Sequence, residues 1–141
     1  MSLLEKAIAI AVKAHRGTRD KSGLPYILHP LRMMCRLQTE DEQIVAVLHD
    51  VVEDTDWTFK DLAREGFPKR IIEPLKCLTK RNGEPYDEFV QRAASHPVAR
   101  RVKLADLEDN MDVRRIGPVG PKDAARLSKY VRAWNTLTEN P

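Results

Sequence analysis

Apolar residues recur along this chain with the period of α-helices. One helical face of the first sixteen residues is apolar, which predicts a helix over residues 2–16; its stripe is Leu3, Leu4, Ala7, Ile8, Ala11 and Ala14. Asp41 is suited to cap a helix that is apolar on nearly every side through Val52, as is typical of a helix at the centre of a bundle. Further helices are predicted, in chain order, over residues 30–37, 58–64, 68–78, 85–94, 97–115 and 122–137. Strand-type alternation is absent from the sequence, so we predict an all-α fold, a compact single-domain helical bundle.

The composition is typical of a globular protein with one core. The chain has 141 residues, 42% of them hydrophobic and 32% charged, so we expect residues 1–141 to form a single domain. No apolar run reaches the roughly 20 residues of a membrane span, and no signal-peptide pattern is present at the N-terminus. We therefore expect a cytoplasmic location. The net charge of +3 is weaker than nucleic-acid binders usually carry, so we expect neither nucleic acid nor membrane as a partner and leave an oligomer open.

Four residues that are able to bind a metal ion stand out from this helical pattern. His29 lies before the second predicted helix, His49 and Asp50 are adjacent near the end of the apolar third helix, and Asp106 lies on the apolar face of the seventh. A charged carboxylate in an apolar segment is costly unless it is paired or binds a metal. The simpler alternative is a hydrogen-bonded His–Asp pair that stabilises the core.

Two further acids follow the His–Asp doublet and favour a site over a structural pair. Glu53 comes four residues after His49, and Asp54 comes four residues after Asp50. On a continuous helix these residues lie on adjoining faces, and such a cluster of titratable groups is typical of a functional site. Imidazole and carboxylate ligands suit Mn²⁺, Fe²⁺ or Zn²⁺, and the acids can orient a water or take its proton.

Three residues are candidates for contacts with a ligand. Asn110 comes four residues after Asp106, where it shares a helix face with that acid. Lys21 and Arg19 lie in the loop before His29 and can contact phosphates. The alternatives are a polar residue at a helix rim for Asn110 and ordinary loop charges for the two cations.

The ordered motifs resemble a known family. AlaHisArgGly (residues 14–17), SerGlyLeuProTyrIleLeuHisPro (22–30), LeuHisAspValValGluAspThr (48–55), LeuThrLys (78–80) and ValLysLeuAlaAsp (102–106) are similar to the HD-type hydrolase domain of RelA/SpoT proteins and to small alarmone hydrolases of the Mesh1-like group. The resemblance implies an HD-type bundle and a Mn²⁺-dependent enzyme that removes pyrophosphate from the 3′ position of guanosine tetra- or pentaphosphate. The sequence has no room for the synthetase or regulatory domains of the long proteins, so we do not expect it to synthesise the nucleotide.

By position, the resemblance also assigns roles to residues. It matches four to the metal ligands of the family, His29, His49, Asp50 and Asp106. It matches Glu53 and Asp54 to the acidic pair that activates water. Lys21 corresponds to a basic residue beside the substrate phosphates, and Asn110 corresponds to a contact on the ribose side.

The chain departs from the family pattern on the side of the base. Asp20 stands where the family usually has an Arg that packs against the base, with Arg19 one residue earlier, and Val113 stands where a Thr is common. LeuGluAspAsnMet at 107–111 replaces ArgLeuHisAsnMet. Two alternatives to a guanine alarmone hydrolase therefore stay open: a hydrolase of another nucleotide, such as an adenine alarmone or NADPH, and a catalytically silent module that binds a nucleotide.

Overall fold

The computed structural model describes residues 1–139, and the regular elements of that part of the chain are helices. They are α1 (Leu3–Ala14), α2 (Leu28–Cys35), α3 (Glu40–Leu48), α4 (Val51–Asp54), α5 (Phe59–Arg64), α6 (Lys69–Cys77), α7 (Tyr86–Ala94), α8 (Pro97–Asn110), the 3₁₀ helix η1 (Val113–Arg115) and α9 (Pro121–Glu139). This arrangement confirms the all-α prediction.

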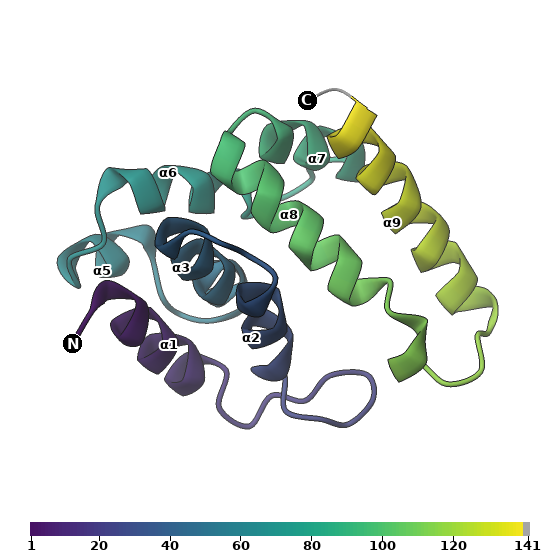
Figure 1. Cartoon of the computed structure of the whole chain (residues 1–141), viewed down its shortest axis with the longest axis horizontal. Coiled ribbons are helices and arrows are strands. Elements are labelled where there is room, and N and C mark those ends of the chain that lie inside the picture. Colours follow the sequence, from purple (N-terminus) through teal and green to yellow (C-terminus); the bar gives the residue numbers. More distant parts are fainter. Residues whose placement is uncertain (140–141) are drawn as a thin grey trace.

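Helix α3 lies at the centre of the main hydrophobic core. Its residues from Ile44 to Leu48 are all buried, and the helix packs against α1, α2, α6 and α8. In Figure 1, α1 and α2 lie below α3, whereas α6 and α8 lie above it. A helix that is apolar on nearly every side requires such cover, so the predicted position of this helix at the centre of the bundle is confirmed.

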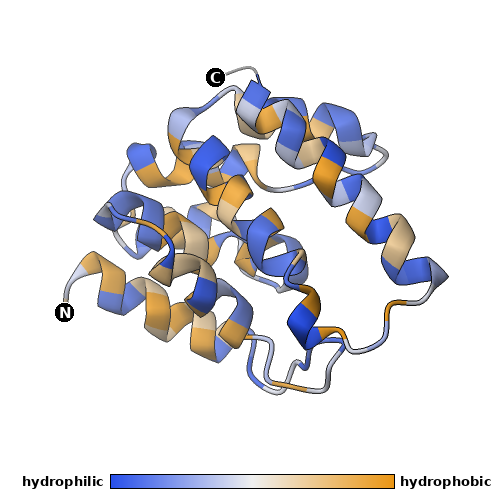
Figure 2. Cartoon of the chain, turned by 45° about the vertical axis from the view of Figure 1, so that its right-hand side comes forward, coloured by the Kyte–Doolittle hydropathy of each residue, from blue (hydrophilic) through white to orange (hydrophobic). Residues whose placement is uncertain are grey.

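A second, smaller core joins α7, α8 and α9. It consists of Val90, Leu107, Ala133 and Leu137. Figure 2 shows hydrophobic and hydrophilic residues alternating along α1 and α9, as expected of helices with one face turned toward a core. Because α9 covers α7 and α8, it brings side chains from the end of the chain close to the residues that α8 carries.

The third predicted helix is wrong in its start and in its continuity. Thr39, and not Asp41, caps α3: its hydroxyl accepts from the Glu42 N–H, and the Glu42 carboxylate accepts from the Thr39 N–H. This reciprocal pair satisfies two amide groups that a helix start leaves open. At the other end α3 stops at Leu48, and α4 begins only at Val51. His49 and Asp50 therefore occupy a break between two helices.

The seventh predicted helix is also shorter than expected. It ends at Asn110, and η1 follows as a separate 3₁₀ turn. The Asp112 carboxylate caps that turn by accepting from the Arg114 N–H at 3.2 Å. Asp favours such caps over helix interiors because its side chain competes for backbone N–H groups, which explains the break.

The remaining predicted helices are confirmed, with ends that differ from the prediction by about two residues. Within residues 1–139, no helix combines the length and the apolar character that crossing a bilayer requires.

Candidate metal centre

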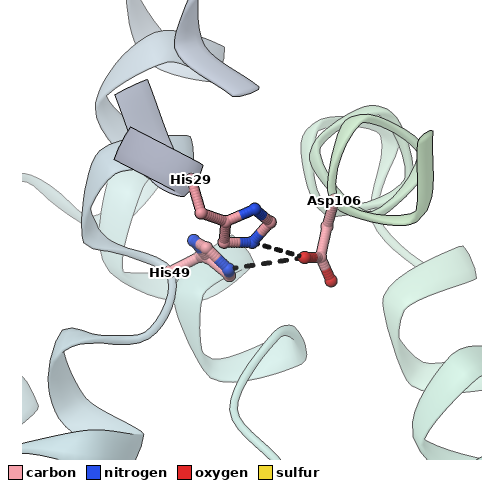
Figure 3. A group of neighbouring side chains, drawn as sticks. All are labelled: His29, His49 and Asp106. Carbon is pink, nitrogen blue, oxygen red and sulfur yellow. Dashed lines mark hydrogen bonds and ion pairs between the residues drawn. The ribbon is translucent and has the colours of Figure 1, made fainter. Parts of the chain in front are cut away.

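Three buried side chains meet beside α3: His29 from α2, Asp106 from α8, and His49 from the break between α3 and α4. Figure 3 shows His29 and His49 directing their rings toward the Asp106 carboxylate. His29 Nε2 lies 2.9 Å from Asp106 Oδ1, and His49 Nε2 lies 3.7 Å from the same oxygen. One ligand atom from each residue lies within 4.8 Å of the others. The geometry thus brings together two nitrogen donors and one oxygen donor that the sequence separates by up to 77 positions.

The second ring nitrogen of each histidine is held by the protein. The Asp109 carboxylate lies 2.7 Å from His29 Nδ1, and the backbone oxygen of Ala46 lies 2.7 Å from His49 Nδ1. Both contacts favour a proton on Nδ1, so Nε2, the nitrogen that faces Asp106, is the atom that can exchange its proton for a metal ion. Histidines that bind metals are typically oriented in this way, so the donor set fits a divalent ion.

The electrostatics of the centre favour a cation. Burial by itself lowers the pKa of His49, but the carboxylates of Asp50 and Asp106 outweigh that effect and raise the pKa to about 9. Burial likewise raises the pKa of Asp106, yet Lys103, His29 and His49 lower it well below its usual range. Burial also raises the pKa of Asp50, but His49 outweighs it and lowers that pKa. The carboxylates of Asp50 and Asp106 are therefore ionised, and they attract positive charge to the place where the two histidine rings meet.

Asp50 joins this centre from the break between α3 and α4. Its Oδ2 lies 3.0 Å from His49 Nε2 and also accepts a hydrogen bond from the Tyr26 hydroxyl. Asp50 belongs as well to a second group of potential metal ligands, in which it lies close to Glu53 and Asp54. All four predicted metal-ligand residues thus lie around one point.

The acidic pair lies at the more exposed side of the same centre. Glu53 Oε1 accepts from the backbone N–H of Lys80 at 2.8 Å, which holds the carboxylate beside the loop after α6. Partial burial, together with the negative charges of Asp50 and Glu53, raises the pKa of Asp54 to about 6. The structure therefore places both predicted acids next to Asp50, although the helix that was expected to carry them is interrupted.

Lys103 is a member of the site to which the sequence analysis assigned no role. It is buried, and its Nζ donates to Asp106 Oδ2 at 2.9 Å. Burial lowers the pKa of this amine, but Asp106 more than compensates and raises it. Lys103 thus occupies one oxygen of Asp106 and leaves Oδ1 facing the histidines. Its position three residues before Asp106, in the ValLysLeuAlaAsp motif, is the signal that could have identified it.

Asp109 is a second functional residue that the sequence analysis missed. It is fully buried and accepts two hydrogen bonds from Arg32, at 2.8 and 3.0 Å, while its Oδ2 also holds His29 Nδ1. Burial raises its pKa, but the bonds from His29 and Arg32 lower it far below the usual range. The sequence showed only that Asp replaces the family His here. The pairing with α2 could not be read from spacing.

A cleft leads from the surface to this centre through two adjoining cavities. The inner cavity has a volume of about 310 Å³, and its lining includes His29, His49, Asp50, Glu53, Lys103, Asp106, Tyr86, Phe89 and Lys129. The outer cavity has a volume of about 460 Å³, and its lining includes Arg19, Lys21, Ser22, Asp112, Ile116, Asp123 and Arg126. Five residues line both: Asp20, Tyr26, Asn110, Arg115 and Tyr130. Both volumes are in the range of small-molecule sites.

The predicted ligand contacts divide between the two cavities. Asn110 Nδ2 donates to Asp106 Oδ1 at 3.1 Å, so Asn110 borders the metal centre directly. Lys21 and Arg19 line only the outer cavity, and the Arg19 guanidinium donates to the Gly23 carbonyl oxygen at 2.8 Å. The structure therefore brings Asn110 to the centre but keeps both loop cations outside it.

The departure from the family pattern at Asp20 has a structural explanation. The Asp20 carboxylate accepts from the backbone N–H groups of Ser22 and Leu24, both at 2.9 Å. This residue therefore organises its own loop in addition to lining the cleft. Val113 is 48% exposed and belongs to the lining of neither cavity.

Comparisons with known proteins agree with this architecture. The chain is 32% identical to a zebrafish (Danio rerio) protein named guanosine-3′,5′-bis(diphosphate) 3′-pyrophosphohydrolase MESH1, with 92% of this chain and 78% of that protein covered. It is 30% identical to an Aquifex aeolicus protein named guanosine-3′,5′-bis(diphosphate) 3′-pyrophosphohydrolase, covering 77% of this chain but only 17% of that longer protein. No family model matches the chain.

A solved structure shares the fold. It is described as a metazoan ortholog of SpoT that hydrolyzes ppGpp, and it superposes with a TM-score of 0.79 at 22% sequence identity. The superposition covers 99% of this chain and 87% of the other. The helical arrangement around the cleft is therefore one that a known structure also adopts.

Proposed function

This chain belongs to the family of guanosine-3′,5′-bis(diphosphate) 3′-pyrophosphohydrolases, and we propose that it is itself a metal-dependent hydrolase that removes pyrophosphate from the 3′ position of ppGpp and pppGpp. The observation that carries the proposal is the meeting of His29, His49 and Asp106 at the floor of a cleft. A structural His–Asp pair would need neither a cleft nor the adjoining acids. The chain spans only about a sixth of the length of the Aquifex relative. We assign the proposed activity to residues 1–141 alone, as a single HD-type domain that acts in the cytoplasm.

In this proposal a divalent ion, Mn²⁺ by preference, is held by four residues, His29, His49, Asp50 and Asp106. Two imidazoles and two carboxylates suit such an ion, and the protein already orients both rings through Asp109 and Ala46. When bound, the ion supplies Lewis-acid polarisation of a phosphoryl oxygen and lowers the pKa of water. Lys103 adds a fixed positive charge on the other side of Asp106.

Glu53 and Asp54 then serve as the residues that orient the attacking water and take its proton. A group whose pKa lies near the working pH is suited to this task, and the raised pKa of Asp54, about 6, meets that condition. Hydrolysis forms a bond from the water oxygen to the phosphorus on the 3′ oxygen and breaks the bond between that phosphorus and the 3′ oxygen. The products are pyrophosphate and a nucleotide with a free 3′ hydroxyl.

Three residues are proposed to contact the substrate. Asn110 is suited to the ribose side, because its amide borders both Asp106 and the junction of the two cavities. Lys21 and Arg19 are suited to phosphates that extend into the outer cavity. The partner implied by these residues is a small nucleotide, not a nucleic acid.

The test is a panel of substrates offered to the purified protein with Mn²⁺. Release of pyrophosphate from ppGpp, at a rate well above that from its adenine counterpart ppApp or of phosphate from NADPH, is the expected result. Preferred cleavage of ppApp or NADPH would identify a different nucleotide hydrolase. No release from any of the three, together with no thermal shift on adding Mn²⁺, would contradict hydrolysis and indicate a silent module.

A further inference from the structure

Arg115 lies at the junction of the two cavities. It is the last residue of η1 and belongs to the lining of both. The Ser22 hydroxyl donates to the Arg115 backbone oxygen at 2.9 Å and so ties η1 to the loop between α1 and α2. The loop and the turn after α8 lie next to each other at the lower right of Figure 1. The backbone of Arg115 is therefore held by the loop on the opposite side of the cleft.

Arg115 is one of several cations around its nearest acid, Asp109. Asp109 already accepts two hydrogen bonds from Arg32 and one contact from His29. Arg115 Nη2 donates to the backbone oxygen of Asp109 and lies 3.3 Å from its carboxylate. The Nε of Arg115 is buried and has no hydrogen-bond partner within residues 1–139. A buried donor without a partner is costly, and the side chain, which is 29% exposed, lines both cavities, so a small reorientation would let this guanidinium bind a ligand in the cleft.

The chemistry of the cleft indicates which part of the ligand Arg115 meets. The inner cavity has cations of its own for phosphates, Lys103 and Lys129, beside the metal centre. With the 3′ phosphates held there, the nucleoside lies toward the outer cavity, next to Arg115, and the 5′ phosphates extend into the outer cavity. A guanidinium is planar and stacks on rings, and its paired donors match O6 and N7 of guanine, whereas adenine presents an amino donor in place of O6.

We infer that Arg115 contacts the purine of the substrate and favours guanine over adenine, an assignment that rests on the proposed function. The test uses Arg115→Ala, with Arg115→Met as a second variant that keeps the apolar stem. Arg114→Ala is the matched control, because Arg114 is the neighbouring residue of η1, its side chain is 85% exposed, and it lines neither cavity, although its partner Asp112 lines the outer one.

The expected result is a KM for ppGpp raised roughly tenfold or more in both variants, with kcat and Mn²⁺ affinity close to wild type. The preference in kcat/KM for ppGpp over ppApp should fall by a similar factor, and Arg114→Ala should change neither value. An unchanged KM, an equal rise for both purines, or a loss of Mn²⁺ affinity would overturn the assignment, since the last indicates a role through Asp109. Wild-type protein that cleaves none of these substrates would instead contradict the proposed function.

Discussion

The inner and outer halves of the cleft are built in different ways. The inner half is formed mainly by helices and by the short break between α3 and α4. Its central groups are buried and held by several contacts each: Asp106, for example, meets His29, Lys103 and Asn110. The outer half is formed largely by the loop before α2, by η1 and by α9. In this outer half, a hydrogen bond from the Ser22 hydroxyl to the Arg115 backbone oxygen joins the loop to η1 across the cleft.

This difference in construction suggests that the inner half carries out the reaction and that the outer half selects the nucleotide. A charge-bearing centre inside a helical core is preorganised, because moving one group would leave its buried partners unpaired. A loop held by a few exposed hydrogen bonds can accept substitutions at much lower cost. We therefore expect changes in the inner half to abolish metal binding or turnover, and changes in the outer half to alter which nucleotide binds.

The largest effect is expected from removing a ligand of the metal centre. Asp106→Ala and His49→Ala each delete one donor and leave the buried cations or acids around it unpaired, so Mn²⁺ binding and pyrophosphate release should both be lost. Metal content of the purified protein and the rate with ppGpp measure this. Glu108→Ala is the control, since its exposed carboxylate pairs with Arg36 and with no other residue of the range 1–139. Normal turnover in either ligand variant would refute the assignment of the centre.

Glu53→Gln should separate metal binding from catalysis. The amide oxygen can still accept from the Lys80 N–H, so the local structure is kept, but one of the two acids that orient the water and take its proton is gone. General bases typically contribute 10²–10⁴ in rate, and a loss of about that size in kcat is expected, with Mn²⁺ affinity unchanged. A variant that turns over like wild type would show that Glu53 does not take the proton.

A smaller effect is expected from Asp109→Asn, which tests whether the partner of His29 tunes the centre. The change removes a charge but keeps the shape, so Arg32 loses its ionic partner, and the one remaining oxygen cannot accept from both Arg32 Nε and His29 Nδ1. Such outer partners are typically worth 10–100-fold in metal affinity. Titration with Mn²⁺ should show a loss in that range. An affinity equal to wild type would mean that Asp109 serves only to anchor Arg32.

The smallest effect is expected in the outer half, from Ser22→Ala. It deletes the hydrogen bond to the Arg115 backbone, and an exposed bond of this kind contributes about 1 kcal/mol or less. Thermal unfolding should shift by a few degrees at most, KM for ppGpp should rise slightly, and Mn²⁺ affinity should stay constant. If Ser22→Ala instead weakened Mn²⁺ binding, the two halves would be coupled and the comparison would fail.

The sequence predicted the donors of the inner half but not the way in which they are held. His49 and Asp50 stand out because they interrupt the most apolar segment of the chain. The break between α3 and α4 that turns them toward the cleft was missed, since helical periodicity continues across it. Thr39 was overlooked as a cap because Asp41 is an equally good cap by residue type.

The contacts between distant segments lay beyond the sequence pattern. Asp109 meets His29 because α8 packs against α2, and Arg115 enters the cleft because α8 ends at Asn110. Spacing along a helix reports neighbours on that helix only. Asp20 shows the same limit: its residue type suggested a lost cation in the base pocket, whereas its carboxylate holds two amides of its own loop.

The most direct test of the central claim is a metal titration of protein stripped with a chelator. Pyrophosphate release from ppGpp should be absent without metal, return as Mn²⁺ fills a single site, and stay absent in Asp106→Ala at the same concentrations. Full turnover by stripped wild-type protein, or an Asp106→Ala protein that responds to Mn²⁺ like wild type, would contradict the claim that His29, His49, Asp50 and Asp106 form the centre of a metal-dependent hydrolase.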